Sequence, residues 1–183
     1  MYNINVSIFL IESQTKQIMG IKDSFMAANL AMKLVFFIIL LANVVNWIAF
    51  CTTSWHVSFF NYTGLWRYNT SPLDGTPDDE YIAIQAFSIF GFISLNVGFG
   101  LIVLYMFWGS CQGNSETNLA AAITLFVSAG SWLIAVAIFG AKFEGTERFG
   151  YSFALAVCAL ILGLIGGIIL IIGGRGNSSV SSK

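Results

Sequence analysis

The sequence predicts an all-α membrane protein: a bundle of four transmembrane helices with a small β-sheet or hairpin in the loop after the first helix. Three observations lead to this fold class. The 183-residue chain is 57% hydrophobic and only 9% charged, whereas a soluble domain carries about 25% charged residues. Its charges gather in short segments separated by four long charge-free intervals. The last part of the first interval, beyond the expected helix, contains an alternating pattern that is typical of a strand.

Each charge-free interval is long enough for one membrane crossing. The four intervals contain 33, 35, 25 and 26 residues, and a spanning helix needs about 20 apolar residues. Backbone groups in lipid must be bonded within a helix or a closed barrel, and these runs lack the alternation of barrel strands. We therefore expect a membrane domain over residues 32–174, with helices at about 32–53, 82–108, 119–141 and 151–173.

The first apolar run favours a spanning helix over a cleavable signal peptide. It begins more than 30 residues into the chain, and it is longer than the apolar core of a signal peptide. The preceding residues 1–31 form either a helix that rests on the membrane surface, with Ile11, Ile18 and Phe25 on one face, or a loosely ordered tail.

The distribution of basic residues predicts the orientation. Four crossings place both termini on the same side of the membrane. If this side is the cytoplasm, residues 1–31, Lys33 and the tail 175–183 hold five of the eight Lys and Arg residues, in agreement with the positive-inside rule. We expect a multi-pass plasma-membrane protein whose first and third connecting loops are extracellular.

The first outer loop carries the strand pattern. Trp55, Val57 and Phe59 alternate with His56, Ser58 and Phe60, and a turn signal follows at residues 61–64. Together these features predict an extracellular hairpin. Asn61 opens an Asn-Tyr-Thr sequence and is a candidate glycosylation site.

The order of motifs resembles the claudin superfamily of claudins, epithelial membrane proteins, peripheral myelin proteins and claudin-like channel subunits. Trp55 follows the first helix, Gly64-Leu65-Trp66 follows in the same loop, and the second and fourth helices open with "IAIQAFSIFG" and "RFGYSFALAV". The resemblance covers about residues 32–174. It implies a small β-sheet on the outer leaflet, with Trp55, Leu65 and Trp66 buried at its base. Without the resemblance, Trp47, Trp55 and Trp66 also fit an interfacial aromatic belt.

The chain departs from that family pattern in its cysteines. The family carries a cysteine pair after Gly-Leu-Trp, and no cysteine occurs here in either outer loop. The three cysteines are Cys51, Cys111 and Cys158. A disulfide is worth about 2–4 kcal/mol, so we expect packing of aromatic side chains to substitute for it in this divergent member.

The sequence offers no candidate for catalysis or cofactor binding. His56 is the only histidine, and apart from Lys33 at the start of the first helix the expected helices contain no ionisable Asp, Glu, Lys or Arg, the usual mark of proton and ion pathways. A net charge of −1 lacks the basic footprint of nucleic-acid binding. We expect no enzyme activity, no cofactor, no metal site and no small-molecule substrate.

Small and amide side chains within the expected helices indicate helix contacts. Small residues recur at four-residue spacing, which lets helix backbones approach closely, either within the bundle or against a partner. Asn43, Asn46 and Asn96 are expected to face the bundle and to bond across helices. The small residues are Ser94, Gly98, Ala159, Gly163 and Gly167.

Two functions fit these expectations. The first is a structural membrane protein of cell–cell contacts, serving a septate- or tight-junction-type barrier or adhesion. The alternative is an auxiliary subunit that modulates the trafficking or gating of an ion channel or receptor. Both functions require the lipid bilayer and either self-association or lateral association with another membrane protein.

Overall fold

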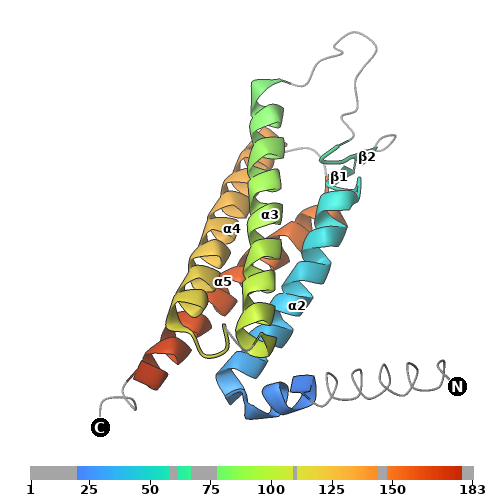
Figure 1. Ribbon diagram of the computed structural model, residues 1–183. Coiled ribbons are helices and arrows are strands. Elements are labelled where there is room, and N and C mark those ends of the chain that lie inside the picture. Colours follow the sequence, from blue (N-terminus) through green and yellow to red (C-terminus); the bar gives the residue numbers. More distant parts are fainter. Residues whose placement is uncertain (1–19, 58–61, 67–77, 109–110, 144–147, 179–183) are drawn as a thin grey trace, which may run out of the picture.

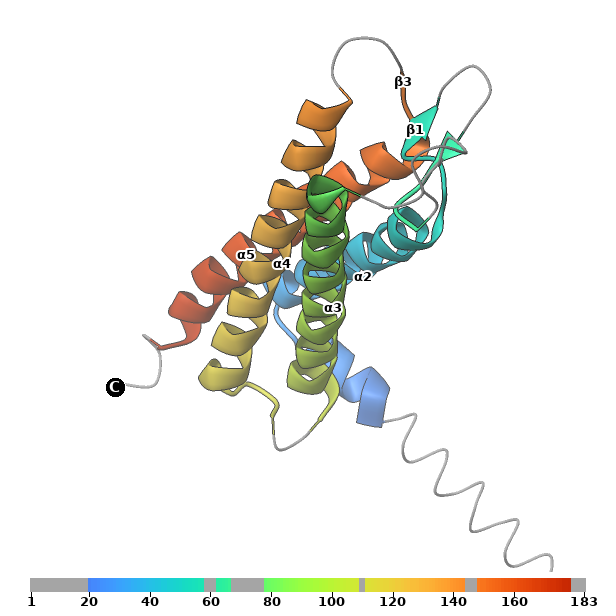
Figure 2. The same cartoon turned by 90° about the horizontal axis from the view of Figure 1, so that it is seen from above.

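The computed structural model describes residues 20–57, 62–66, 78–108, 111–143 and 148–178. Four long helices lie side by side in one bundle, and short strands gather at one end of it (Figures 1 and 2). We call this end the sheet end. The helices are α2 (Leu30–Cys51), α3 (Asp79–Phe107), α4 (Ser115–Lys142) and α5 (Tyr151–Ser178).

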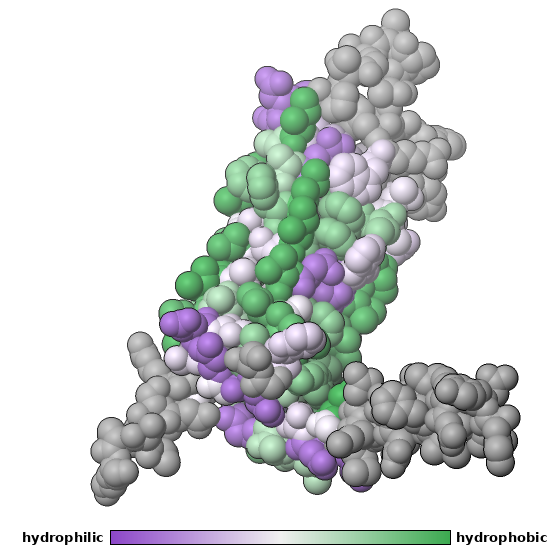
Figure 3. Space-filling view, in the orientation of Figure 1, coloured by the Kyte–Doolittle hydropathy of each residue, from purple (hydrophilic) through white to green (hydrophobic). Residues whose placement is uncertain are grey.

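All four helices are long and apolar enough to cross a membrane, over Tyr151–Gly173 in the case of α5. Large apolar side chains cover the outside of the bundle, for example Leu41, Phe90 and Ile123, each more than half exposed. Figure 3 shows the resulting hydrophobic band. A helix that is apolar on all sides requires lipid or protein around it. The predicted four-helix membrane fold is confirmed, and its helix ends differ from the expected ranges by a few residues.

Side chains just before three helices explain where these helices begin. Asn29 accepts a hydrogen bond from the Met32 amide (2.8 Å), Asp78 from the Tyr81 amide (3.0 Å) and Asn114 from the Glu116 amide (2.9 Å). Each cap satisfies a backbone donor that the helix leaves open and is worth about 1 kcal/mol.

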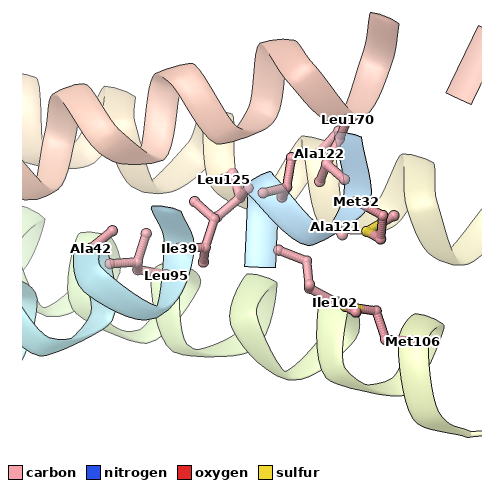
Figure 4. Packing of buried hydrophobic residues seen from close by; sticks show 11 residues of the cluster. Met32, Ile39, Ala42, Leu95, Ile102, Met106, Ala121, Ala122, Leu125 and Leu170 are labelled. Carbon is pink, nitrogen blue, oxygen red and sulfur yellow. The ribbon is translucent and has the colours of Figure 1, made fainter. Parts of the chain in front are cut away.

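The core in the half of the bundle away from the sheet end is made of aliphatic and methionine side chains from all four helices (Figure 4). Glycines allow the helices to come this close. A methyl group at Gly98 would lie 2.8 Å from Leu125 Cδ2, and one at Gly166 would lie 2.3 Å from Ile39 Cδ1. The residues of this core are Met32, Val35, Ile39, Ala42, Leu95, Ile102, Met106, Ala121, Ala122, Leu125 and Leu170.

The other small residues that the sequence singled out also face neighbouring helices, with one exception. Ala159 is fully buried, a methyl group at Gly163 would lie 3.4 Å from Leu95 Cδ1, and one at Gly167 would lie 3.2 Å from Phe126 Cε2. Ser94 is only half-buried.

The sheet has three two-residue strands in the order β2-β1-β3. β1 (His56–Val57) pairs antiparallel with β2 (Tyr62–Thr63), which confirms the predicted hairpin. β3 (Arg148–Phe149) comes from the segment between α4 and α5 and pairs with the other edge of β1. The turn expected over residues 61–64 is wrong in part, because Tyr62 and Thr63 belong to a strand; Asn61 lies outside the described residues.

A short helical segment, residues 20–27, precedes α2. Phe25 packs edge-on against Phe36 and Phe37, with ring centroids 6.5 and 6.1 Å away. Lys33 Nζ donates to the Met26 carbonyl oxygen at 3.1 Å. The segment is therefore tied to the first turns of α2; Ile11 and Ile18 lie outside the described residues.

Candidate functional site

Trp55 is the centre of the contact between the sheet and the helices. Its side chain is fully buried, and its Nε1 donates to the Ala49 carbonyl oxygen at 2.9 Å. The indole stacks on Trp132 (6.1 Å between centroids) and meets Phe139 edge-on (5.1 Å). Its backbone amide donates to the Thr63 carbonyl oxygen at 3.0 Å. Trp55 thus holds the hairpin to the end of α2 and to α4.

The Gly64-Leu65 pair is held by side chains from α3. Tyr81 Oη donates to the Gly64 carbonyl oxygen, and Gln85 Nε2 donates to the Leu65 carbonyl oxygen at 2.8 Å. Leu65 and Tyr81 are fully buried. A methyl group at Gly64 would lie 2.3 Å from Thr53 Cα, so only glycine allows these two backbone segments to cross.

The expectation that Trp66 is buried at the base of the sheet is wrong. Trp66 is 48% exposed. Its Nε1 donates to the Phe50 carbonyl oxygen at 2.8 Å, and its ring lies edge-on against Phe50, which stacks on Phe92. The side chain therefore covers the outside of the α2 end with its polar edge satisfied, the arrangement that suits tryptophan at a membrane–water boundary.

The end of the segment between α4 and α5, together with the start of α5, joins the same assembly, mainly through backbone hydrogen bonds. The Ser152 amide donates to the Ser54 carbonyl oxygen (3.1 Å), and the Gly150 amide donates to the Trp55 carbonyl oxygen (2.9 Å). The Ser152 hydroxyl accepts from the Ser54 amide at 3.2 Å and lies 2.6 Å from the Thr52 hydroxyl. A methyl group at Gly150 would lie 2.0 Å from the Ser54 carbonyl oxygen.

A buried amide supports Trp132 beneath the sheet. Asn46 is fully buried in α2. Its Oδ1 accepts from Trp132 Nε1 at 3.0 Å, and its Nδ2 donates to the Phe92 carbonyl oxygen at 3.5 Å. This amide therefore connects α2, α3 and α4, as the sequence predicted for Asn46.

An ion pair joins the sheet-end termini of α3 and α4. Lys142 Nζ bonds to Asp78 and lies 3.2 Å from Glu80 Oε2. The hydrogen bond from Lys142, followed by the one from the Tyr81 amide, lowers the pKa of the Asp78 carboxyl below its ordinary value. The carboxylate is thus stabilised in its charged form where it caps α3.

The buried tryptophan, the Gly-Leu-Trp segment held by α3, and four spanning helices occur together in one chain. The model of the PMP-22/EMP/MP20/Claudin family matches residues 23–170. The protein belongs to this family. The matched range includes α2, α3 and α4 entirely and most of α5. No individual curated protein matches the sequence.

This claudin-like tetraspan fastens the loop between α2 and α3 to its helices without a disulfide. Cys51, Cys111 and Cys158 are free thiols. The indole of Trp55, the hydroxyl of Tyr81 and the amide of Gln85 instead provide hydrogen bonds between the loop and the helices. Here the hydrogen bonds and the aromatic packing supply the attachment.

For several of the side chains that hold the sheet to the helices, this role could not be predicted from the sequence. Gln85 lies within the stretch that carried the family resemblance, but nothing in that stretch indicates its partner. Tyr81, Trp132 and Ser152 have no local signal because their partners are far away in the chain. Among the described residues, no three His, Cys, Asp or Glu side chains gather as a metal site would require.

Proposed function

We propose that this claudin-like tetraspan is a structural protein of cell–cell contacts that contributes to a septate- or tight-junction-type barrier or to adhesion. The observation that supports this role best is the construction of the sheet. Strands from both outer loops form one sheet, and this sheet is fixed to the helix bundle by the buried Trp55.

A fixed outer sheet suits a contact surface. Binding through a surface that is already ordered loses less conformational entropy than binding through a mobile loop. The polar groups of Trp55, Asn46 and Gln85 are used in holding the sheet and the helices together. These bonds favour a structural role over catalysis, so we propose no enzymatic activity and no small-molecule substrate.

The proposed topology places the sheet end outside the cell and both termini in the cytoplasm of a plasma-membrane protein. Five of the eight Lys and Arg residues lie in residues 1–33 and 175–183, and this distribution supports the proposed topology. In this topology Asn61 is accessible to glycosylation, and treatment with a glycosidase should shift the mass of the wild type but not that of Asn61→Gln.

Affinity purification in mild detergent, followed by mass spectrometry, tests the role. The tagged chain is purified from confluent cells and from the same cells after dispersal. A junction protein should recover itself and junctional scaffold proteins from the confluent cells, with much less scaffold after dispersal. Recovery of one channel or receptor at fixed stoichiometry from both samples would contradict this role and support the auxiliary-subunit function.

A further inference from the structure

Two asparagines and a tryptophan form a polar cluster on the lipid-facing side of α2 and α3. Asn43 Nδ2 donates to Asn96 Oδ1 at 3.3 Å, and Trp47 Nε1 donates to the same oxygen at 3.1 Å. Asn43 and Asn96 are only half-buried, and Trp47 is 50% exposed. The expected bond across helices is therefore confirmed for Asn43 and Asn96, but both side chains lie at the edge of the contact between α2 and α3 and not in the buried interior. We call Asn43, Trp47, Asn96 and Gly100 the amide notch.

The amide notch lies deep within the membrane-spanning part of the bundle. Asn43 stands eight residues before Cys51, the last residue of α2, which corresponds to about 12 Å along the helix axis. The hydrocarbon core of a bilayer is about 30 Å thick, so Asn43 lies near its middle. Figure 3 shows a hydrophilic patch between α3 and α2 within the hydrophobic band.

The amides of the notch keep unused hydrogen-bonding capacity. Among the described residues, none donates to Asn43 Oδ1, and Asn43 and Asn96 each use a single amide N–H. Asn46, three positions along α2, has both its oxygen and its nitrogen bonded and is fully buried. An amide with open bonding capacity is costly in hydrocarbon, which favours a polar partner in the bilayer.

Gly100 leaves room for a close neighbour beside these amides. It is exposed one turn along α3 from Asn96, and a methyl group there would meet no atom within 4 Å. An open glycine is not by itself evidence of a partner, since Gly130 on α4 is open in the same way. At position 100, however, the open space adjoins the half-buried amides, so that a second helix crossing there could approach α3 closely and reach them.

We propose that the amide notch is the contact surface of a homodimer in which a second copy of this chain is the partner. Two copies inserted with the same topology carry Asn43 at the same depth, as a two-fold axis along the membrane normal requires. The notch offers both a free acceptor and free N–H donors, so it is complementary to itself. Its surroundings are uncharged, since Val44, Ile93 and Val97 are the exposed neighbours, and this disfavours a charged partner helix.

This dimer gives a specific form to the self-association on which the proposed junction role rests. It is tested with the full-length protein in lipid vesicles, by energy transfer between copies labelled at a C-terminal tag while the protein is diluted in lipid. Asn43→Leu removes the open acceptor, and Gly100→Leu blocks close approach. Gly130→Leu is the matched control, because Gly130 is also exposed, on α4, and a methyl group there would meet no atom within 4 Å.

The wild type and Gly130→Leu should dimerise alike. Asn43→Leu and Gly100→Leu should each raise the dissociation constant by about threefold to thirtyfold, the size expected of one interhelical contact in lipid. All four proteins should unfold at similar temperatures, which separates lost association from misfolding. A wild type that stays monomeric at every dilution, or equal weakening in Gly130→Leu, would overturn the dimer.

Cross-linking in cells directly identifies the protein that binds the amide notch. Gly100→Cys is placed in a chain that carries Cys51→Ser, Cys111→Ser and Cys158→Ser, with Gly130→Cys in the same background as control. Oxidation should link two copies through position 100 and not through position 130. A product that joins this chain to a different protein, without the self-linked product, would overturn the second copy as partner.

The dimer and the junction role can fail separately. A dimer that is not enriched at cell contacts would count against the junction role alone. A monomer that is enriched at cell contacts would count against the dimer alone.

Discussion

Trp55 Nε1 donates a hydrogen bond to the Ala49 carbonyl oxygen, 2.9 Å away in the last turn of α2. Both side chains are fully buried. The last carbonyl groups of a helix have no partner within the helix, so this bond satisfies one of them while it fixes the first strand of the sheet. The outer sheet therefore continues from the helix bundle as a single packed structure.

The two tryptophans of the first loop should differ in their contribution to stability. Trp55→Ala removes a buried aromatic side chain and should lower the free energy of unfolding by about 3–5 kcal/mol. Trp66→Ala removes a half-exposed side chain and should cost clearly less. Thermal unfolding of the two purified variants in one detergent provides the comparison. Equal losses of stability would contradict the assignment of Trp55 as a buried anchor and of Trp66 as a residue at the membrane–water boundary.

Gly64 should not tolerate even a methyl group. Gly64→Ala places Cβ 2.3 Å from the backbone of Thr53, which cannot move aside as a flexible side chain can, so we expect a loss of roughly 1–3 kcal/mol or more. Gly130→Ala, where the added methyl meets nothing within 4 Å, should be neutral or slightly stabilising. Unfolding temperature and delivery to the cell surface report the difference; matching behaviour of the two variants would argue against the close backbone crossing.

Asn46 and Trp132 should be energetically coupled. Asn46→Leu leaves the buried Trp132 N–H without its acceptor, and Trp132→Phe removes the same bond from the other side. A double-mutant cycle on unfolding should give a coupling of about 1 kcal/mol. Additive effects of the two substitutions would mean that the hydrogen bond does not stabilise the helix bundle.

The ion pair at the ends of α3 and α4 should depend on pH in one direction. The pKa of Asp78 lies below its ordinary value of 3.8 in the folded protein, chiefly because of Lys142. Its contribution to stability is therefore present above pH 3.8 and is lost as the pH falls below that value. Lys142→Met should weaken this dependence but not abolish it, because the Tyr81 amide also lowers the pKa of Asp78; the cost should be at most about 1 kcal/mol, as for other ion pairs near a surface. Unfolding curves of both proteins across this pH range provide the measurement, and identical acid sensitivity would contradict the assignment.

Much of the fold follows from local features of the sequence. Charge-free intervals gave the helices, and the alternation that starts at Trp55 gave the hairpin. β3 could not be predicted, because two residues carry no periodic pattern and their pairing depends on how the helices pack. The exposure of Trp66 was missed for a related reason: the family resemblance implied that the side chain is buried, while its actual position depends on its hydrogen bond to Phe50 in α2. Likewise, the difference between Asn46 and Asn43 reflects their positions around one helix relative to neighbours that are distant in sequence.

The most direct test of the proposed role compares two kinds of cell contact in a mixed culture. Cells expressing the fluorescent full-length protein are mixed with cells that lack it, and fluorescence is measured where two expressing cells meet and where an expressing cell meets a non-expressing one, relative to a membrane dye. A contact between two expressing cells contains two labelled membranes and a mixed contact only one, so their fluorescence differs twofold without any interaction. A contact protein that engages its counterpart should exceed this twofold ratio clearly. A ratio of two or less would contradict the account.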